Sequence, residues 1–317
     1  MFLCVSPNPA IDKRLTLPAL VPGEIHRART VQSFPGGKST HVAMVLRALG
    51  EAPHWIGLCG GATGEQLVSG LRALGINPHP CATLAETRTN LEIIDDAGGV
   101  TEIREPGSAP SADELAAFER TCKNLFEQGR ESASVIFSGS LPDGVAPDLY
   151  ARLIRAAREA GCRTLLDTSG EPLRLALAAQ PDFVKPNRDE AAALLGSMIN
   201  SMNSVANAVK QILSLGARSA AISLGADGLV FHAGKNAPSL FAPSLPIHPR
   251  STVGCGDAAL AGFAHAIASN SSAEDALRLA AACAAANCIA DSPGAARFGD
   301  IQRFCGQISV SELSSGP

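Results

Sequence analysis

From about Ser134 onward, short runs of β-branched and other apolar residues alternate with Ala- and Leu-rich stretches of helical periodicity. The runs SVIFS, RTLLD, DFVK and SAAISL predict strands. Helices are predicted over 147–160, near 171–179, from Arg188 and over about 205–215. Strands and helices that alternate at this spacing imply a parallel sheet with helices on both faces, so the predicted fold class is α/β. Such sheets bind ligands at the carboxyl ends of their strands.

Two early regions break this alternation. The stretches KRLTLPAL and HRARTVQSF, and later TNLEIID and VTEIRE, alternate apolar with charged residues and predict exposed strands. They indicate a small sheet set apart from the main body, and a flap over a site and an ordinary edge hairpin fit the pattern equally well. The apolar N-terminal run MFLCVS meets Pro7 and Pro9 at once and has no basic residues before it, so it predicts a buried first strand rather than a signal peptide.

The composition narrows the class of protein. A content of 46% hydrophobic and 18% charged residues is typical of a folded domain, and no stretch is long and apolar enough to span a bilayer. The net charge of -4 argues against a nucleic-acid partner but leaves an anionic small molecule open. The nine cysteines are scattered and form no C-x-x-C pair, which favours reduced thiols in the cytoplasm.

The most informative stretch is the loop Ser251-Thr-Val-Gly-Cys-Gly-Asp257, which leads into an apolar helical run. The glycines around Cys255 allow a tight turn whose amides, together with a helix N-terminus, make an anion hole for a phosphoryl group. The amides would be those of Gly254, Cys255 and Gly256, and Asp257 is placed to accept the proton of an attacking hydroxyl. Taken alone, the motif is more typical of a turn and an aspartate that caps a helix, because short glycine motifs are weak signals.

The surroundings of this loop favour the chemical interpretation. The loop resembles the G-A-G-D signature of the PfkB (ribokinase-like) carbohydrate kinase family, with Cys255 where alanine is usual. Three further blocks resemble family motifs and occur in the family's order: Ser138-Gly-Ser-Leu-Pro-Asp-Gly144, Lys185-Pro-Asn-Arg-Asp-Glu190 and Ser223-Leu-Gly-Ala-Asp-Gly228. The resemblance covers essentially residues 1–300.

The resemblance implies a fold and a set of nucleotide ligands. The fold would be a doubly wound, mainly parallel sheet flanked by helices over 1–307, with a β-sheet lid from segments near 11–34 and 86–105 and a frayed tail over 308–317. The expected cosubstrate is ATP with Mg²⁺, and the lid of such kinases commonly pairs two copies, so a homodimer is expected. Asn187 and Glu190 would organise the metal; the other expected nucleotide-binding residues are Lys185, Ser223, Gly225, Gly228 and Asn287.

The acceptor side resembles the branch of the family that acts on fructose 1-phosphate and tagatose 6-phosphate. Ser6-Pro-Asn-Pro-Ala-Ile-Asp12 and Pro35-Gly-Gly-Lys-Ser-Thr-His-Val-Ala43 carry this likeness. The resemblance implies that Asp12 binds sugar hydroxyls and that Lys38 and Arg88 meet the phosphate already on the sugar, with Arg27 as a weaker third candidate. The remaining sugar-binding residues implied are Gly36, Gly37, His41 and Ser138.

Two features of the Gly37-Lys38-Ser39 segment bear on its function. It mimics the end of a Walker A loop, but a glycine that the motif requires is Gln32 here and Pro35 stiffens the cradle, so a P-loop is rejected. Ser39 replaces a family glycine, which predicts a restricted backbone position. His41 replaces an asparagine that normally hydrogen-bonds the sugar, and a histidine is bulkier and titrates near neutrality.

The sequence therefore predicts a cytoplasmic, ATP-dependent kinase of a ketohexose phosphate. Fructose 1-phosphate is the preferred substrate, followed by tagatose 6-phosphate and fructose 6-phosphate. Two alternatives remain. A protein that binds nucleotide or sugar phosphate without turnover is motivated by Ser39 and His41, whereas the intact Asp257 speaks against it. A kinase of an unphosphorylated sugar or nucleoside is disfavoured by Lys38 and Arg88.

Overall fold

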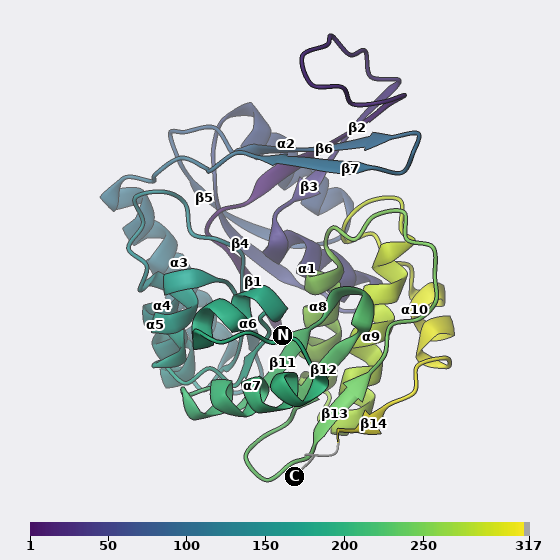
Figure 1. The fold of residues 1–317 in the computed structure, drawn as a ribbon. Helices are drawn as coiled ribbons and strands as arrows, with labels where there is room; N and C mark the ends of the chain where they lie inside the picture. Colours follow the sequence, from purple (N-terminus) through teal and green to yellow (C-terminus); the bar gives the residue numbers. More distant parts are fainter. Residues whose placement is uncertain (314–317) are drawn as a thin grey trace.

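The computed structural model describes residues 1–313, whose main feature is one large twisted sheet (Figure 1). Within these residues the sheet has ten strands in the order β14-β13-β12-β11-β10-β9-β8-β1-β4-β5. The strands from β5 to β11 run parallel, and β12, β13 and β14 extend the edge in antiparallel pairs. The strand bounds are β1 Phe2–Ser6, β4 His54–Cys59, β5 Asn77–Ala82, β8 Ser134–Ser138, β9 Arg163–Asp167, β10 Phe183–Val184, β11 Ser219–Ser223, β12 Leu229–His232, β13 Ser239–Ala242 and β14 Ser311–Glu312.

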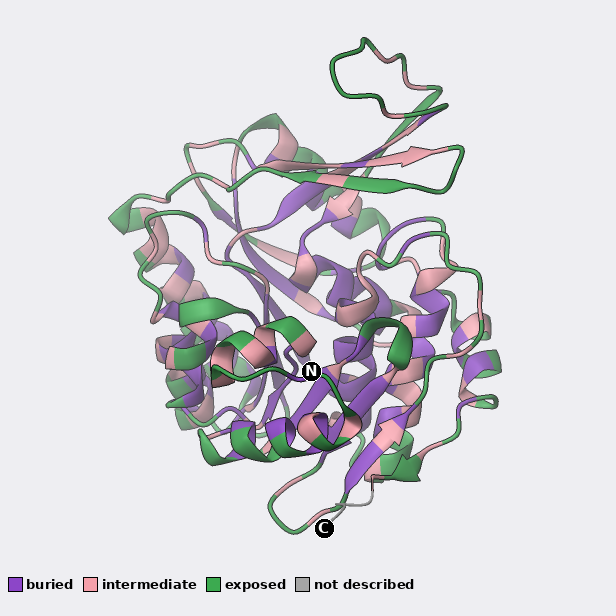
Figure 2. Cartoon of the chain, in the orientation of Figure 1, coloured by how far each residue is buried: buried purple, intermediate pink, exposed green. Residues whose placement is uncertain are grey.

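Helices cover both faces of this sheet and bury two separate apolar cores. One core packs α1 (Lys38–Ala48), α2 (Gly61–Ala73), α8 (Cys255–Ala268), α9 (Ala273–Cys288) and α10 (Phe298–Cys305) against the sheet. The other packs α3 (Ala112–Gly129), α4 (Leu149–Glu159), α5 (Gly170–Leu177), α6 (Arg188–Leu195) and α7 (Met202–Ser214). Figure 2 shows the central strands buried and the outer helix faces exposed, as expected for a sheet covered on both sides.

A second sheet of four strands stands apart from the body and forms a lid (Figure 1). Its order is β3-β2-β6-β7, and the bounds are β2 Ala10–Leu17, β3 Thr30–Gly36, β6 Thr89–Asp95 and β7 Val100–Arg104. The central pair β2–β6 is parallel and the outer pairs are antiparallel. The loop between β2 and β3 projects from the molecule (Figure 1), and Ile25 within it is 97% exposed.

The close packing of α8 on α9 explains the Ala-rich composition of the C-terminal region. Gly262 lies so close to α9 that an added Cβ would be 2.7 Å from the Cα of Ala280. Two helix backbones can approach in this way where the facing residues are glycine, which has no Cβ, and alanine, which has only a methyl group. The tight packing fixes α8, and with it the loop of residues 251–257 at its N-terminus.

The predicted α/β class, the doubly wound sheet and the separate small sheet are confirmed. The first strand is buried throughout, and TNLEIID coincides with β6. The predicted helix over 205–215 is α7, which begins at Met202 because Ser201 caps it. The antiparallel edge formed by β12 to β14 was not predicted.

The expectation of a frayed tail over 308–317 is wrong for the part of it that the structure describes. Ile308 is buried, β14 pairs with β13, and the Leu313 amide donates to the Ser239 carbonyl at 2.8 Å. Backbone pairing with an open sheet edge stabilises this segment despite its polar composition. Residues 314–317 of the predicted tail lie outside the described residues.

Two further properties concern the chain as a whole. The nine cysteines are all free thiols, and most are buried. In the described part of the chain, every helix is too short or too polar to cross a lipid bilayer.

Candidate active site

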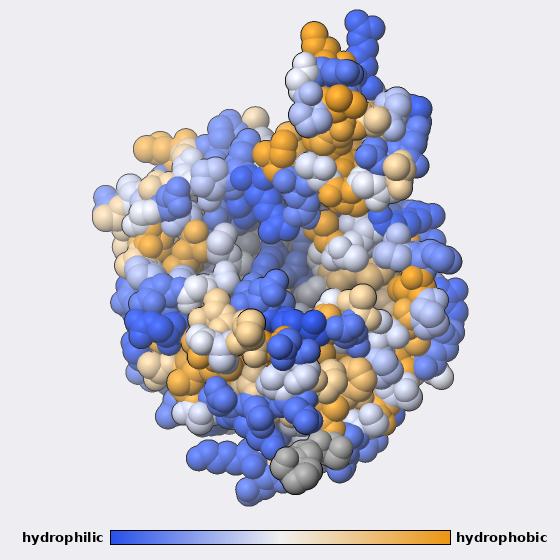
Figure 3. Space-filling view, in the orientation of Figure 1, coloured by the Kyte–Doolittle hydropathy of each residue, from blue (hydrophilic) through white to orange (hydrophobic). Residues whose placement is uncertain are grey.

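The main cleft of the molecule lies between the lid and the carboxyl ends of the parallel strands. It has a volume of about 770 Å³. Figure 3 shows this hollow near the centre of the face, with hydrophilic side chains in it. Residues that follow β1, β8, β9 and β10 line its floor, including Asn8, Gly139, Thr168, Lys185 and Asn187, and Ser223 at the end of β11 joins them. Strand ends therefore form the site, as parallel sheets predict.

The lid supplies the roof of the cleft. Asp12 from β2, Asn90 from β6 and Arg104 from β7 all line it. The structure thus decides between the two interpretations that the sequence left open: the small sheet is a flap over a site and not an edge hairpin.

The glycine-rich loop and Asp257 lie on the body side of the cleft. Gly254 caps α8 with φ of 79°, a left-handed conformation that a side chain would strain. Gly254, Gly256 and Asp257 line the cleft, whereas Cys255 does not. The N-terminus of α8 therefore opens into the cleft and presents backbone amides and a positive dipole end to it.

The Cys255 side chain packs behind the loop. Its Sγ lies 3.0 Å from the Sγ of Cys288. This contact and burial both raise the pKa of the Cys255 thiol, so the thiol stays protonated. Cys255 contributes its backbone to the loop, and its thiol fills the space under it.

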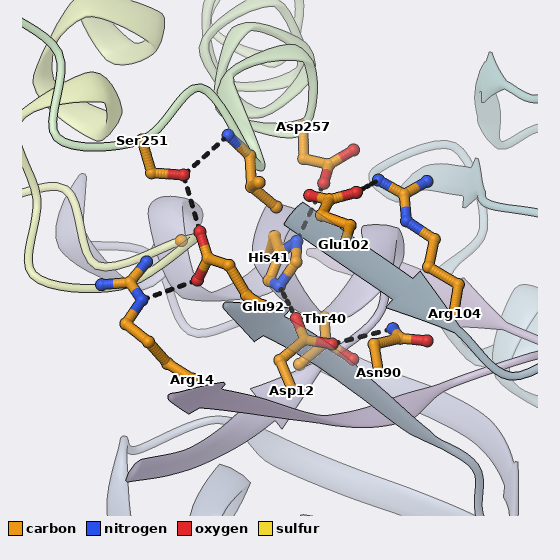
Figure 4. A network of polar contacts seen from close by, with 12 residues as sticks. Asp12, Arg14, Thr40, His41, Asn90, Glu92, Glu102, Arg104, Ser251 and Asp257 are labelled. Carbon is orange, nitrogen blue, oxygen red and sulfur yellow. Dashed lines mark hydrogen bonds and ion pairs between the residues drawn. The ribbon is translucent and has the colours of Figure 1, made fainter. Parts of the chain in front are cut away.

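A histidine bridges two carboxylates across the cleft (Figure 4). The His41 Nδ1 lies 2.9 Å from Oδ2 of Asp257, and its Nε2 lies 2.8 Å from Oδ2 of Asp12. Burial lowers the pKa of His41, but the hydrogen bonds and charges of the two carboxylates outweigh it and raise that pKa to about 10. The expectation that His41 titrates near neutrality is therefore wrong, because two anions face its ring.

Asp12 is held from several sides. Its Oδ1 accepts from the Asn90 amide at 2.9 Å. Burial raises the pKa of Asp12, but the bonds from His41 and Asn90 and the charge of Arg88 lower it below its usual value overall. An added Cβ on Gly36 would be 2.3 Å from the Asp12 Cγ. Gly36 does not line the cleft, so the space next to Asp12 is what requires a glycine there.

A second charge cluster lies deeper in the cleft, around Asp167. The Lys38 ammonium is 3.1 Å from Asp167 Oδ1 and 3.9 Å from Glu190, and the Lys185 ammonium is 2.6 Å from Asp167 Oδ2. The charge of Asp167 raises the pKa of Lys38 against the effect of burial, and Asp257 and Glu190 add to the rise. Lys38 and Lys185 share the buried carboxylate of Asp167, and Glu190 is the second anion of the cluster.

Lys38 thus lies beside Lys185 and Glu190, the residues expected to bind the triphosphate. The family resemblance implies that Lys38 meets the phosphate on the sugar, whereas its ion pairs in the structure are with Asp167 and Glu190. The reason is that Lys38 is the first residue of α1 and extends under the lid toward β9 and α6. Gly37, with φ of 92°, makes the turn into this helix.

Asn187 and Glu190 begin α6 with a reciprocal cap. The Asn187 Oδ1 accepts from the Glu190 amide, and Oε2 of Glu190 accepts from the Asn187 amide, both at 2.8 Å. Both residues line the cleft. Among the described residues no cluster of three or more His, Cys, Asp or Glu side chains could hold a metal ion. The side-chain oxygens of Asn187 and Glu190, next to an anion site, suit Mg²⁺ as ligands, because this ion completes its coordination shell with water and phosphate oxygens.

The comparisons with known proteins agree with this geometry. Residues 8–296 match the model of the pfkB family carbohydrate kinases. The chain belongs to this family. It is 37% identical to a 1-phosphofructokinase of Rhodobacter capsulatus over 280 residues, 88% of this chain and 87% of that protein. It is 29% identical to a 1-phosphofructokinase of Borreliella burgdorferi, with 99% of each chain covered. The phosphofructokinase-2 of Escherichia coli in complex with potassium superimposes with a TM-score of 0.90, at 29% identity over 97% of this chain and 98% of that one.

Several residues that the sequence analysis assigned to the kinase site lie elsewhere. Ser138 is buried at the end of β8, its Oγ has no hydrogen-bond partner, and Gly139 and Ser140 line the cleft in its place. Gly225 and Gly228 shape the turn after β11 through positive φ angles but do not line the cleft, whereas Ser223 does. These positions were read from a motif, and a motif does not tell which of its residues face the ligand.

Asn287 is a further correction. It does not line the cleft but braces the loop of residues 251–257 from behind. Its amide nitrogen donates to the Val253 carbonyl at 2.8 Å, and its Oδ1 accepts from the Gly294 amide at 2.8 Å. A buried amide that satisfies two backbone groups fixes the loop conformation.

The cationic side chains that the lid region presents to the cleft are Arg88 and Arg104. Arg88 donates to the carbonyls of Asn8, Pro9 and Glu105, which orient the guanidinium without neutralising its charge. Arg104, which the sequence analysis missed, contacts Glu102 and lines the same cleft. Arg27 is exposed on the projecting loop and does not line the cleft, so its expected role is not supported within one chain.

Helix α1 bears on two expectations from the sequence: the backbone restriction at Ser39 and the rejection of a P-loop. Ser39 lies in α1 with an ordinary helical backbone, so the expected restriction of that position does not occur. Helix α1 follows β3 of the lid and not a strand of the main sheet, which is not the strand–loop–helix arrangement of a P-loop.

A buried ion pair within the lid is linked to the loop of residues 251–257 by a hydrogen bond from Ser251 (Figure 4). The Arg14 Nε donates to Oε2 of Glu92 at 2.6 Å, and both side chains are less than a tenth exposed. Oε1 of Glu92 accepts from the Ser251 hydroxyl at 2.8 Å, and the Ser251 Oγ accepts from the Val253 amide at 3.2 Å. Glu92 therefore connects the lid strand β6 to the start of the loop that carries Asp257.

The sequence analysis missed Asp167, Asn90 and Glu92. A signal existed for Asp167, because it ends a predicted strand where ligands bind. Asn90 is the register partner of Asp12 in the parallel pair β2–β6, and no sequence pattern gives that register.

We expect Glu92→Ala to lower the free energy of unfolding by about 3–5 kcal/mol, because it leaves the Arg14 guanidinium buried without its anion. Urea unfolding followed by circular dichroism measures the change. The matched control is Glu127→Ala, which removes an exposed pair with Arg130 and should cost less than about 1 kcal/mol. Equal losses in the two variants would show that the buried Arg14–Glu92 pair stabilises the fold no more than an exposed pair does.

Proposed function

We propose that this kinase transfers the γ-phosphoryl group of ATP to fructose 1-phosphate and produces fructose 1,6-bisphosphate. The observation that carries the proposal is the position of Asp257, at the mouth of α8 with the lid carboxylate Asp12 on one side and the lysine cluster on the other. Curated relatives at up to 37% identity are named 1-phosphofructokinase, which supports this substrate over tagatose 6-phosphate and fructose 6-phosphate.

The acceptor sugar would lie under the lid. Asp12 has lone pairs left after its bonds to His41 and Asn90, and these suit the hydroxyls of a sugar. Arg88 and Arg104 would bind the phosphate that the sugar already carries, because guanidinium groups bind phosphate oxygens in pairs. The charge on this side is what favours a sugar phosphate over a free sugar or a nucleoside.

The triphosphate would lie on the other side of Asp257. Lys38 and Lys185 would neutralise its charge, and Asn187, Glu190 and Ser223 line the same part of the cleft. Asn187 and Glu190 would hold Mg²⁺, which supplies charge neutralisation on the phosphate oxygens.

The reaction is an in-line displacement. Asp257 takes the proton of the primary hydroxyl, whose oxygen then forms a bond to the γ-phosphorus while the bond from that phosphorus to the bridging oxygen of ADP breaks. Among the described side chains, only His41 hydrogen-bonds the Asp257 carboxylate, and it does so through Oδ2, so Oδ1 remains for the hydroxyl. The amides at the N-terminus of α8 would stabilise the charge that develops on the transferring group.

A protein that binds these ligands without turnover is the alternative from another class. The replacement of the family asparagine by His41 motivates it. The Asp257 carboxylate nevertheless lines the cleft at a helix N-terminus, which a pure binding protein does not require.

The first test is a coupled assay of ADP release over ketohexose phosphates. We expect turnover with fructose 1-phosphate, and a kcat that falls about 10²- to 10⁴-fold in Asp257→Asn because the general base is lost. Near-normal kcat in this variant would refute the role of Asp257. Binding of ATP without ADP release on any of the sugars would favour the non-catalytic alternative.

The second test concerns the phosphate of the sugar. Arg88→Ala should lower kcat/KM for fructose 1-phosphate about 10- to 100-fold, mainly through KM, because a charged hydrogen bond to the substrate is lost. Free fructose, as a poor substrate, should lose much less. Arg29→Ala on the same lid is the control, since Arg29 pairs with Asp96 outside the cleft. A similar loss with both sugars would place the phosphate elsewhere.

We also propose a cytoplasmic homodimer. The nine free thiols suit a reducing compartment. The lid exposes apolar side chains that a second copy would cover, among them Val21, Ile25, Val31 and Ile103 at 41%, 97%, 55% and 53% exposure. Sedimentation velocity should give twice the mass of one chain, and Ile25→Lys with Val31→Lys should give monomers. A wild-type monomer at micromolar concentration would contradict the proposal.

A further inference from the structure

The bridge between Asp12, His41 and Asp257 joins three parts of the molecule. Asp12 comes from the lid strand β2, His41 from helix α1 and Asp257 from helix α8. The side chains of the three residues are 14%, 6% and 7% exposed, respectively. The separations of 2.8 and 2.9 Å are those of full hydrogen bonds.

The protonation state of the bridge follows from hydrogen-bond chemistry. An ionised carboxylate only accepts hydrogen bonds, so each ring nitrogen that faces one must donate. A neutral imidazole has one donor and one acceptor nitrogen and would leave one carboxylate facing a lone pair. Since both ring nitrogens of His41 face carboxylates, the ring carries both protons and is an imidazolium.

The surroundings of His41 favour this charged form. The anions that face it are Asp12 from β2 and Asp257 from α8. The cations of the cleft act from further away: Lys38 on the same helix is paired with Asp167, and Arg88 lies beyond Asp12. Arg104 on β7 is paired with Glu102. Gly294 packs against the backbone of α1, since an added Cβ would be 3.1 Å from the His41 Cα. The two hydrogen bonds to Asp12 and Asp257 fix the direction of the ring.

We propose that His41 is a positioning residue that holds the catalytic carboxylate of Asp257 and the sugar-binding carboxylate of Asp12 at a fixed separation. The inference rests on the proposed roles of Asp12 and Asp257. Because the imidazolium engages Oδ2 of Asp257, it turns Oδ1 toward the acceptor hydroxyl. Because it also engages Asp12, the lid residue that orients the sugar is tied to the base that deprotonates it. Without the cation, two buried carboxylates would repel each other and separate.

The kinetic test is His41→Asn, which introduces the residue usual in the family, together with His41→Gln. An asparagine side chain is too short to reach both carboxylates. We expect kcat to fall about 10- to 100-fold, the cost of a base displaced by about 1 Å, while KM for the sugar phosphate changes less than kcat. The matched control is His232→Asn, which alters another buried histidine, in β12, that does not line the cleft.

The pH profile separates positioning from a simple structural role. In the wild type, kcat/KM should fall only at low pH on the acidic side of its profile, because the bonds from His41 help to hold the pKa of Asp12 below its usual value. In His41→Asn the burial that raises this pKa remains while the imidazolium is gone, so the acidic limb should move to higher pH. A variant with unchanged kcat, a raised KM and the wild-type pH profile would make His41 a plain sugar contact and overturn the proposal.

A measurement on the native protein does not depend on the substrate. In nitrogen NMR spectra of histidine-labelled protein at pH 8, we expect one ring with both nitrogens protonated whose signal disappears in His41→Asn. A neutral tautomer for His41 would overturn the proposal even if the kinase activity is as proposed. The protonated ring would support the bridge even if the preferred sugar phosphate proves to be another one.

Discussion

The buried cation of His41 between two carboxylates is the interaction on which the geometry of the site depends. It lies where the lid, helix α1 and helix α8 meet, and each of these elements contributes one of its three side chains. Burying one charge alone would cost far more than any packing gain could offset. Three charges that neutralise one another in part and share two hydrogen bonds are tolerated, and they hold the lid strand β2 next to α1 and α8.

The same principle governs the rest of the cleft. Asp167 lies between two lysines. Glu92 forms an ion pair with the Arg14 guanidinium and accepts a hydrogen bond from the Ser251 hydroxyl. Each buried charge thus has a partner from a distant part of the sequence, and each pair joins two elements. The result is a site whose dipoles and charges are oriented before any ligand binds. Phosphoryl transfer needs little else from a protein, because its transition state is stabilised mainly by fixed charges.

The sequence was sufficient for the fold class, the separate small sheet and the central loop, because these rest on local patterns. Alternating apolar runs gave β8 and β9, and the glycines around Cys255 marked the N-terminus of α8. The orientation of side chains within motifs was not accessible in the same way. Ser138 and Asn287 were assigned to ligands, yet one is buried in β8 and the other braces the loop. Such facts depend on which neighbours tertiary packing provides, and a single sequence does not contain them.

The charge of His41 is the sharpest case of this limit. Read as an isolated side chain, a histidine in place of an asparagine looks like a weakened sugar contact that titrates near neutrality. Its partners are 29 and 216 residues away in the chain, and both are carboxylates. Once they are known, the substitution has a different meaning, since an asparagine provides no positive charge between Asp12 and Asp257. Gly36 supports this view, because the space that it leaves open is filled by the Asp12 carboxylate in the position that the imidazolium requires. The departure from the family motif is therefore compatible with an active kinase and does not by itself indicate a lost function.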